Sequence, residues 1–115
     1  NEKIEINVRS IFLQGLLLKS DKDYLIKNFN RWNKIWEIWF DFINNSKNEF
    51  SPLQTCIDFI RNISGIDKVV VGVNSYNDLE KILLFFEDEP IVNFPDIKSN
   101  DENLIYPYNW KHNVY

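Results

Sequence analysis

The 115-residue chain has no methionine, one cysteine, one histidine and no apolar run as long as a bilayer span. A single cysteine, Cys56, cannot form an internal disulfide or a cysteine zinc site, and it fits a reducing, cytoplasmic environment. The lack of a long apolar run predicts that the chain has no membrane contact. Because a translation product starts with methionine, we expect the sequence to be a processed piece, a fragment, or a chain lacking its first part.

The chain also lacks an excess of positive charge, since 13 Lys and Arg stand against 17 Asp and Glu, for a formal net charge of -4. Nucleic-acid binding needs a basic face that neutralises phosphates, so this balance argues against a nucleic-acid partner. The acidic residues 87–89 have no spacing typical of a metal site, and we interpret them as a solvated charge run. His112 is expected at the surface. We therefore predict no metal.

What is present is the composition of one globular domain, 44% hydrophobic and 26% charged. Apolar and polar residues alternate over residues 4–10, which predicts a β-strand. Residues 68–73 are rich in valine, which is typical of a strand buried on both faces of a parallel sheet. Helical patterns separate the two segments, so their order predicts a right-handed parallel crossover and an α/β architecture.

Three segments have the pattern of helices. Apolar residues recur at steps of three and four over residues 24–44, which predicts one long amphipathic helix. Ser51 and Gln54 have the spacing of a helix N-cap and its partner, and that helix is expected to end at residues 64–65. A third helix is expected to follow Ser75. Residues 87–115 are predicted to be an extended tail with a final turn near residues 106–110.

Two side-chain patterns on these helices could be mistaken for sites. Trp32, Trp36 and Trp39 form a stripe on the first helix, which we interpret as core or interface. Sugar stacking or a substrate lid is the less favoured interpretation. Cys56 lies on the apolar face of the second helix, and we interpret it as a small core residue rather than a nucleophile.

The junction between the valine-rich strand and the third helix is a general anion-binding arrangement. Ser75 and Asp78 have the spacing of an N-cap and its reciprocal partner. The first N–H groups of a helix lack internal partners, and the helix dipole adds partial positive charge there. Any βα unit can carry this pattern, and most such units are structural. The junction alone therefore does not assign a function.

Four segments together resemble the C-terminal part of the aldo/keto reductases, over essentially the whole chain. Residues 8–17 (VRSIFLQGLL) resemble the seventh-strand segment, including its bend at Gln14-Gly15. Residues 51–60 resemble the helix before the eighth strand, and residues 68–75 resemble that strand with its cofactor-binding turn. Residues 104–110 (LIYPYNW) are similar to the C-terminal motif of a bacterial subgroup. The resemblance implies a partial (β/α)8 TIM barrel, with residues 1–115 as one C-terminal segment.

The resemblance also implies a function. The parent protein would be an NAD(P)H-dependent oxidoreductase that passes hydride to a small-molecule carbonyl substrate, with NADP as cofactor and NAD as the alternative. Arg9 stands where the family has an aromatic residue under the nicotinamide, and Asn74 replaces a basic residue often used against a 2′-phosphate. By position, the cofactor-binding residues would be Arg9, Ser10, Phe12, Gln14, Gly15, Gly72, Asn74, Ser75 and Asp78.

The family's catalytic Asp, Tyr, Lys and His lie on earlier strands, and none of their motifs is present, so we predict no catalytic residue in this chain. We expect the chain alone to have no reductase activity. The alternative is a non-catalytic interaction domain derived from a barrel fragment, with its sheet edges and tryptophan-rich helix as docking surfaces. The isolated chain is expected to self-associate, because missing strands would leave apolar faces bare.

Overall fold

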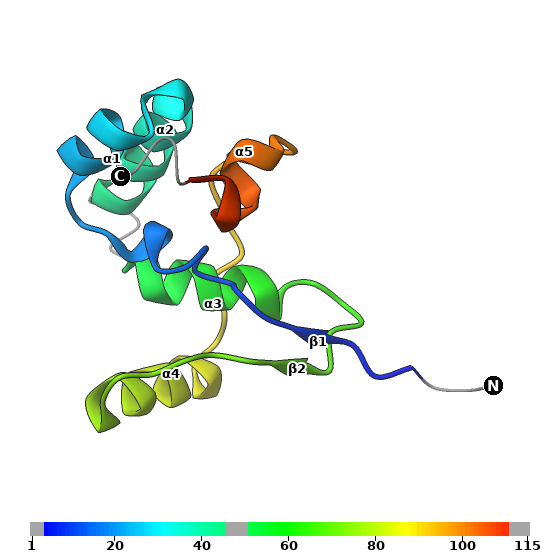
Figure 1. Cartoon of the computed structure of the whole chain (residues 1–115). Coiled ribbons are helices and arrows are strands. Elements are labelled where there is room, and N and C mark those ends of the chain that lie inside the picture. The colour runs from blue at the N-terminus through cyan, green and yellow to red at the C-terminus, as the bar shows by residue number, and fades with distance from the viewer. Residues whose placement is uncertain (1–3, 46–50, 111–115) are drawn as a thin grey trace. The chain divides into compact units, whose positions relative to one another are not determined.

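A computed structural model describes residues 4–45 and 51–110 (Figure 1). The described residues form a mixed, mostly helical structure with one two-stranded parallel sheet. In chain order the elements are β1 (Asn7–Val8), the 3-10 helix η1 (Leu16–Leu18), α1 (Lys22–Asn28), the 3-10 helix η2 (Asn30–Trp32), α2 (Asn33–Asn44), α3 (Pro52–Arg61), β2 (Lys68–Val69), α4 (Tyr76–Glu87), α5 (Glu102–Ile105) and the 3-10 helix η3 (Pro107–Trp110). The mixture of helices and strands was predicted, and the partial barrel stays a prediction.

The chain divides into two compact units, which are described separately. The first comprises Asn1–Leu17 and Ser51–Phe94 and is called the sheet unit, because it holds β1, β2, α3 and α4. The second comprises Leu18–Phe50 and Pro95–Tyr115 and is called the aromatic unit, because all four tryptophans lie in it.

The sheet consists of β1 and β2 side by side and parallel, as predicted (Figure 1). Asn7 pairs with Lys68, and Val8 pairs with Val69. The ladder is continued by the backbone N–H of Val70, which donates to the carbonyl oxygen of Val8 at 2.8 Å. Two segments that are far apart in sequence are thereby held together at the carboxyl ends of their strands.

Both strands are shorter than the predicted segments 4–10 and 68–73. Ser10 has φ +60°, in the left-handed region, and so turns the first segment out of the extended conformation. Burial on both faces is wrong for the valine-rich segment, since Val70 is 59% exposed and Val73 is 40% exposed. A sheet of two strands lacks the neighbours that would cover such side chains.

Helix α3 begins as the sequence predicts. Ser51 is its N-cap and its Oγ accepts a hydrogen bond from the Gln54 N–H at 3.1 Å, while Pro52 occupies the first turn. The helix ends at Arg61, earlier than the predicted residues 64–65. Cys56 is buried on its inner face, and burial raises the pKa of its thiol to about 12. This confirms Cys56 as a core residue, since a neutral thiol is a poor nucleophile.

The predicted single helix over residues 24–44 is wrong, because the chain leaves the helical conformation at Phe29 and again at Trp32. Phe29 has φ -132° and ψ 41°, and it separates α1 from η2. The buried Trp36 indole N–H donates to the Phe29 carbonyl oxygen at 2.9 Å. The Trp32 backbone N–H donates to the same oxygen at 3.1 Å, so the Phe29 carbonyl accepts two hydrogen bonds at the break.

Aromatic side chains from both parts of the aromatic unit meet around Phe29. Its ring centroid lies 6.1 Å from that of Trp32, 6.3 Å from that of Trp36 and 5.2 Å from that of Trp110. Trp32, Trp36 and Trp39 are all buried. This confirms the interpretation of the tryptophan stripe as core.

The predicted tail over residues 87–115 has more regular structure than expected. Asp101 caps the short helix α5 by accepting a hydrogen bond from the Asn103 N–H at 3.0 Å. The final turn expected near residues 106–110 is present as η3. His112, which was predicted at the surface, lies outside the described residues.

Candidate functional site

The candidate site lies where the chain leaves the carboxyl ends of β1 and β2. Because the two strands are parallel neighbours, residues 9–15 and 70–75 leave the sheet at the same edge. In α/β sheets and barrels, this edge is where ligands bind, since the loops and the helix N-termini that follow the strands converge there.

The segment after β1 is a tight turn rather than an open loop. Ser10, Leu13 and Gln14 have φ values of 60°, 51° and 55°, and Gly15 has φ 81°. The Leu13 N–H donates to the Ser10 carbonyl oxygen at 3.0 Å, and the Leu16 N–H donates to the Leu13 carbonyl oxygen at 3.0 Å. Left-handed conformations at residues other than glycine are costly, and here they occur in a turn closed by hydrogen bonds within its own backbone.

This turn leaves backbone donors free. Within the described part of the chain, the N–H groups of Gln14 and Gly15 donate no hydrogen bond. Consecutive N–H groups in a turn form a concave arrangement that favours anions. The turn can therefore offer main-chain donors to a phosphate without a basic side chain.

The segment after β2 leads into the amino end of α4. Ser75 is the N-cap, and its Oγ accepts a hydrogen bond from the Asp78 N–H at 3.2 Å, as predicted. Asp78 places a carboxylate in the first turn, which stabilises the helix through its dipole. The same carboxylate opposes a second anion, so it is better suited to accept a hydrogen bond from a ligand hydroxyl group than to face a phosphate.

The predicted cofactor-binding residues lie on these two segments, except Asp78 in the first turn of α4, and each is exposed or half-buried. They are Arg9, Ser10, Phe12, Gln14 and Gly15 after β1, and Gly72, Asn74, Ser75 and Asp78 after β2. The two groups follow parallel neighbouring strands, and these residues are together called the rim.

A cavity of about 470 Å³ also lies in the sheet unit, but it contains none of these residues. Its lining comes from β1, β2, the end of α3 and the segment after it, and the end of α4. The lining residues are Asn7, Ile60, Arg61, Ile63, Ile66, Asp67, Lys68, Val69, Val70 and Phe86. The cavity and the predicted rim are therefore separate features of this unit.

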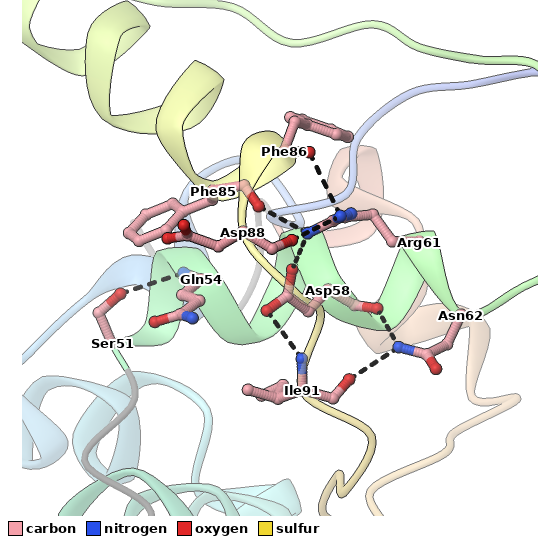
Figure 2. A network of polar contacts seen from close by, with 9 residues as sticks. All are labelled: Ser51, Gln54, Asp58, Arg61, Asn62, Phe85, Phe86, Asp88 and Ile91. Carbon is pink, nitrogen blue, oxygen red and sulfur yellow. Dashed lines mark hydrogen bonds and ion pairs between the residues drawn. The ribbon is translucent and has the colours of Figure 1, made fainter.

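A polar network that the sequence pattern did not predict joins α3 to the end of α4 (Figure 2). Arg61 donates to Asp58 Oδ1 at 3.1 Å and to the carbonyl oxygens of Phe85 at 2.6 Å and Asp88 at 2.8 Å. Asp58 is 1% exposed. Two charged residues three positions apart on a largely apolar helix face were the available signal, since a buried charge needs a partner.

Some kinds of site are absent from residues 4–45 and 51–110. No cluster of His, Cys, Asp and Glu in these ranges could hold a metal ion. No helix in the same ranges combines the length and the apolar character needed to cross a membrane.

Comparisons of the chain with protein-family models, with curated proteins and with solved structures find no match.

Proposed function

We propose that this chain is the C-terminal, cofactor-binding part of an NAD(P)H-dependent aldo/keto reductase, which reduces a carbonyl substrate or oxidises an alcohol by hydride transfer. The parallel pairing of β1 with β2 carries the proposal, because it brings the two predicted cofactor segments to one edge of the sheet. Antiparallel or separated strands would have been incompatible with neighbouring positions in a barrel.

The donors at this edge fit the phosphate groups of a dinucleotide. The free N–H groups of Gln14 and Gly15 would hold the pyrophosphate, and the amino end of α4 at Ser75 would face the adenosine phosphate. Asn74 is neutral and Asp78 is acidic, so the side chains add no positive charge for a 2′-phosphate. The family resemblance implies NADP as the cofactor, and the lack of positive charge here is the reason for keeping NAD as the alternative.

The nicotinamide ring, when bound, supplies the hydride. The residues of this chain bind and orient the cofactor, and the proton donor would come from the preceding strands of the parent protein. Exposed apolar side chains of the sheet unit, including Ile6, Val70 and Leu83, are the surface that those strands and helices would cover. We expect no NADPH-dependent reduction of an aldehyde by the isolated chain.

The test is binding of adenosine 2′,5′-bisphosphate and of AMP to the chain, measured by isothermal titration calorimetry. Gly15→Ala is expected to weaken both affinities about three- to tenfold, because alanine disfavours the left-handed backbone that aims the donors. Gly65→Ala is the matched control. Gly65 also has a left-handed φ, of 90°, and open space around it, but it lies outside the rim.

Absence of binding to the unmodified chain would contradict the proposal, and so would equal losses in the two glycine variants. The second candidate function is a non-catalytic interaction domain, which is favoured by the exposed apolar residues of α4. Leu79, Leu83, Leu84 and Phe86 are 37–55% exposed. Concentration-dependent association in size-exclusion chromatography, together with no nucleotide binding, would favour this second function.

A further inference from the structure

Helix α4 is held in the sheet unit by few buried side chains. Ile82 is the one buried residue among its twelve, and Phe85 is half-buried. Leu79, Leu83 and Phe86 are each more than a third exposed. Apolar packing against α3 therefore fixes only a narrow strip of this helix.

Polar contacts at the carboxyl end of α4 supply what packing does not (Figure 2). The guanidinium group of Arg61 donates to the carbonyl oxygens of Phe85 and Phe86 at 2.6 and 3.3 Å, and to that of Asp88 at 2.8 Å. Orphan carbonyl groups at a helix end are good acceptors, and the helix dipole favours a cation there. Arg61 thus caps a helix to which it does not belong.

Arg61 is itself fixed by its own helix. Its guanidinium is 3.1 Å from Asp58 Oδ1, and the Asp58 side chain is 1% exposed. Asp58 Oδ2 accepts a hydrogen bond from the Ile91 N–H at 3.2 Å, and the Asn62 side chain donates to the Ile91 carbonyl oxygen at 2.8 Å. The end of α3 therefore holds both the last carbonyls of α4 and the segment that follows.

We propose that Arg61 is a positioning residue: by holding the carboxyl end of α4 against α3, it sets the direction of that helix and so the place of the Ser75 cap at its amino end. A helix of twelve residues is about 18 Å long. If α4 tilts about its carboxyl end, its amino end therefore moves farther than any other part of the helix. The consequence for ligand binding rests on the proposed cofactor function.

The experiment compares Arg61→Lys with the unmodified chain. Lysine keeps the charge, but it cannot span several carbonyl oxygens and Asp58 as the planar guanidinium does. Amide hydrogen exchange is expected to be about tenfold faster in α4 and residues 88–91, while the amides of α3 keep their protection. A rise spread evenly over the sheet unit, or no rise in α4, would overturn the inference.

The second measurement is calorimetric affinity for adenosine 2′,5′-bisphosphate, which we expect Arg61→Lys to weaken about three- to tenfold. Arg31→Lys is the matched control, because Arg31 also pairs with an aspartate and lies over an aromatic ring, but in the aromatic unit. It is expected to change neither the affinity nor the exchange of α4. An unchanged affinity in Arg61→Lys would contradict the positioning role.

The two proposals fail in different ways. If the unmodified chain binds no adenosine 2′,5′-bisphosphate, the cofactor function is wrong, and the exchange of α4 still decides whether Arg61 holds this helix. If Arg61→Lys does not fold, the pair Asp58→Asn with Arg61→Met removes both charges together and is measured in the same way. Protection of α4 equal to that of the unmodified chain in this double variant would overturn the inference.

Discussion

Asp101 is the polar residue that joins the tail to the first helices of the aromatic unit. Its Oδ2 accepts a hydrogen bond from the Trp32 indole N–H at 3.0 Å and lies 3.4 Å from the Arg31 guanidinium. Its Oδ1 accepts from the Asn103 N–H at 3.0 Å. The hydrogen bond from the Asn103 backbone lowers the Asp101 pKa below 3.8, and the Trp32 indole and the Arg31 charge act in the same direction.

This lowered pKa predicts an acid-sensitive aromatic unit. A carboxyl group whose pKa is lower in the folded state than in the unfolded state stabilises the folded state. For Asp101 this stabilisation is fully present at pH values above the unfolded pKa, near 3.8. It is lost as the pH falls through the lower pKa of the folded state. Urea unfolding followed by tryptophan fluorescence should therefore show a lower midpoint as pH falls below about 4. Asp101→Asn should lose part of this pH dependence, and an identical pH profile in the variant would contradict the assignment.

The residues that sequence analysis found and missed differ in how far their partners lie along the chain. Ser51 and Ser75 were predicted as caps because each bonds a residue three positions away. Asp101 bonds Trp32 across 69 residues, and Arg61 bonds Phe85 across 24. When the partner of a polar residue lies far along the chain, the sequence shows only a charged residue on an apolar helix face, which is a weak signal.

At the scale of elements, the starts of α3 and α4 were more predictable than the continuity of a helix. The periodicity of residues 24–44 is real, since Trp32, Trp36 and Trp39 are all buried. The helix nevertheless breaks at Phe29, and the Phe29 carbonyl oxygen there accepts a hydrogen bond from the Trp36 indole N–H. Hydrophobic spacing reports which face is buried, but it does not report where a carbonyl group finds another donor.

Alanine variants of the two serine caps can distinguish an effect on helix stability from an effect on ligand binding. Replacing Ser51 or Ser75 with alanine should each cost about 1 kcal/mol of stability, because each removes one acceptor for an unpaired helix N–H group. Only Ser75→Ala should also weaken binding of adenosine 2′,5′-bisphosphate, since Ser51 caps α3 outside the rim. Chemical denaturation gives the first quantity and calorimetry the second. Equal effects of both variants on binding would show that α4 has no special relation to the ligand.

At the scale of the molecule, the sheet unit and the aromatic unit are stabilised by different means. The sheet unit has a ladder of two residue pairs, the α3–α4 packing and the Arg61 network. Its exposed apolar residues include Ile4 at 78%, Val70 at 59% and Leu83 at 55%. The aromatic unit instead closes around Phe29. The sequence pattern indicated the parallel sheet, but the division into two units depends on long-range contacts, such as Trp32 with Asp101 and Phe29 with Trp110, that no local pattern reports.

These differences predict that the two units unfold in separate steps. All four tryptophans, at positions 32, 36, 39 and 110, lie in the aromatic unit, so tryptophan fluorescence reports on that unit alone. Far-UV circular dichroism reports on helices of both units, including α3 and α4. In a urea titration at neutral pH, the circular dichroism should begin to change at lower urea than the fluorescence, because the described part of the sheet unit buries fewer large apolar side chains than that of the aromatic unit.

The Asp101→Asn variant provides the control for this experiment. It should lower the midpoint of the fluorescence transition and leave the early part of the circular dichroism transition unchanged, since Asp101 has its partners within the aromatic unit. Coincident transitions by both methods, in the unmodified chain and in the variant, would mean that the chain unfolds as one cooperative body. In that case a substitution such as Arg61→Lys would destabilise the aromatic unit as well, and tryptophan fluorescence would detect it.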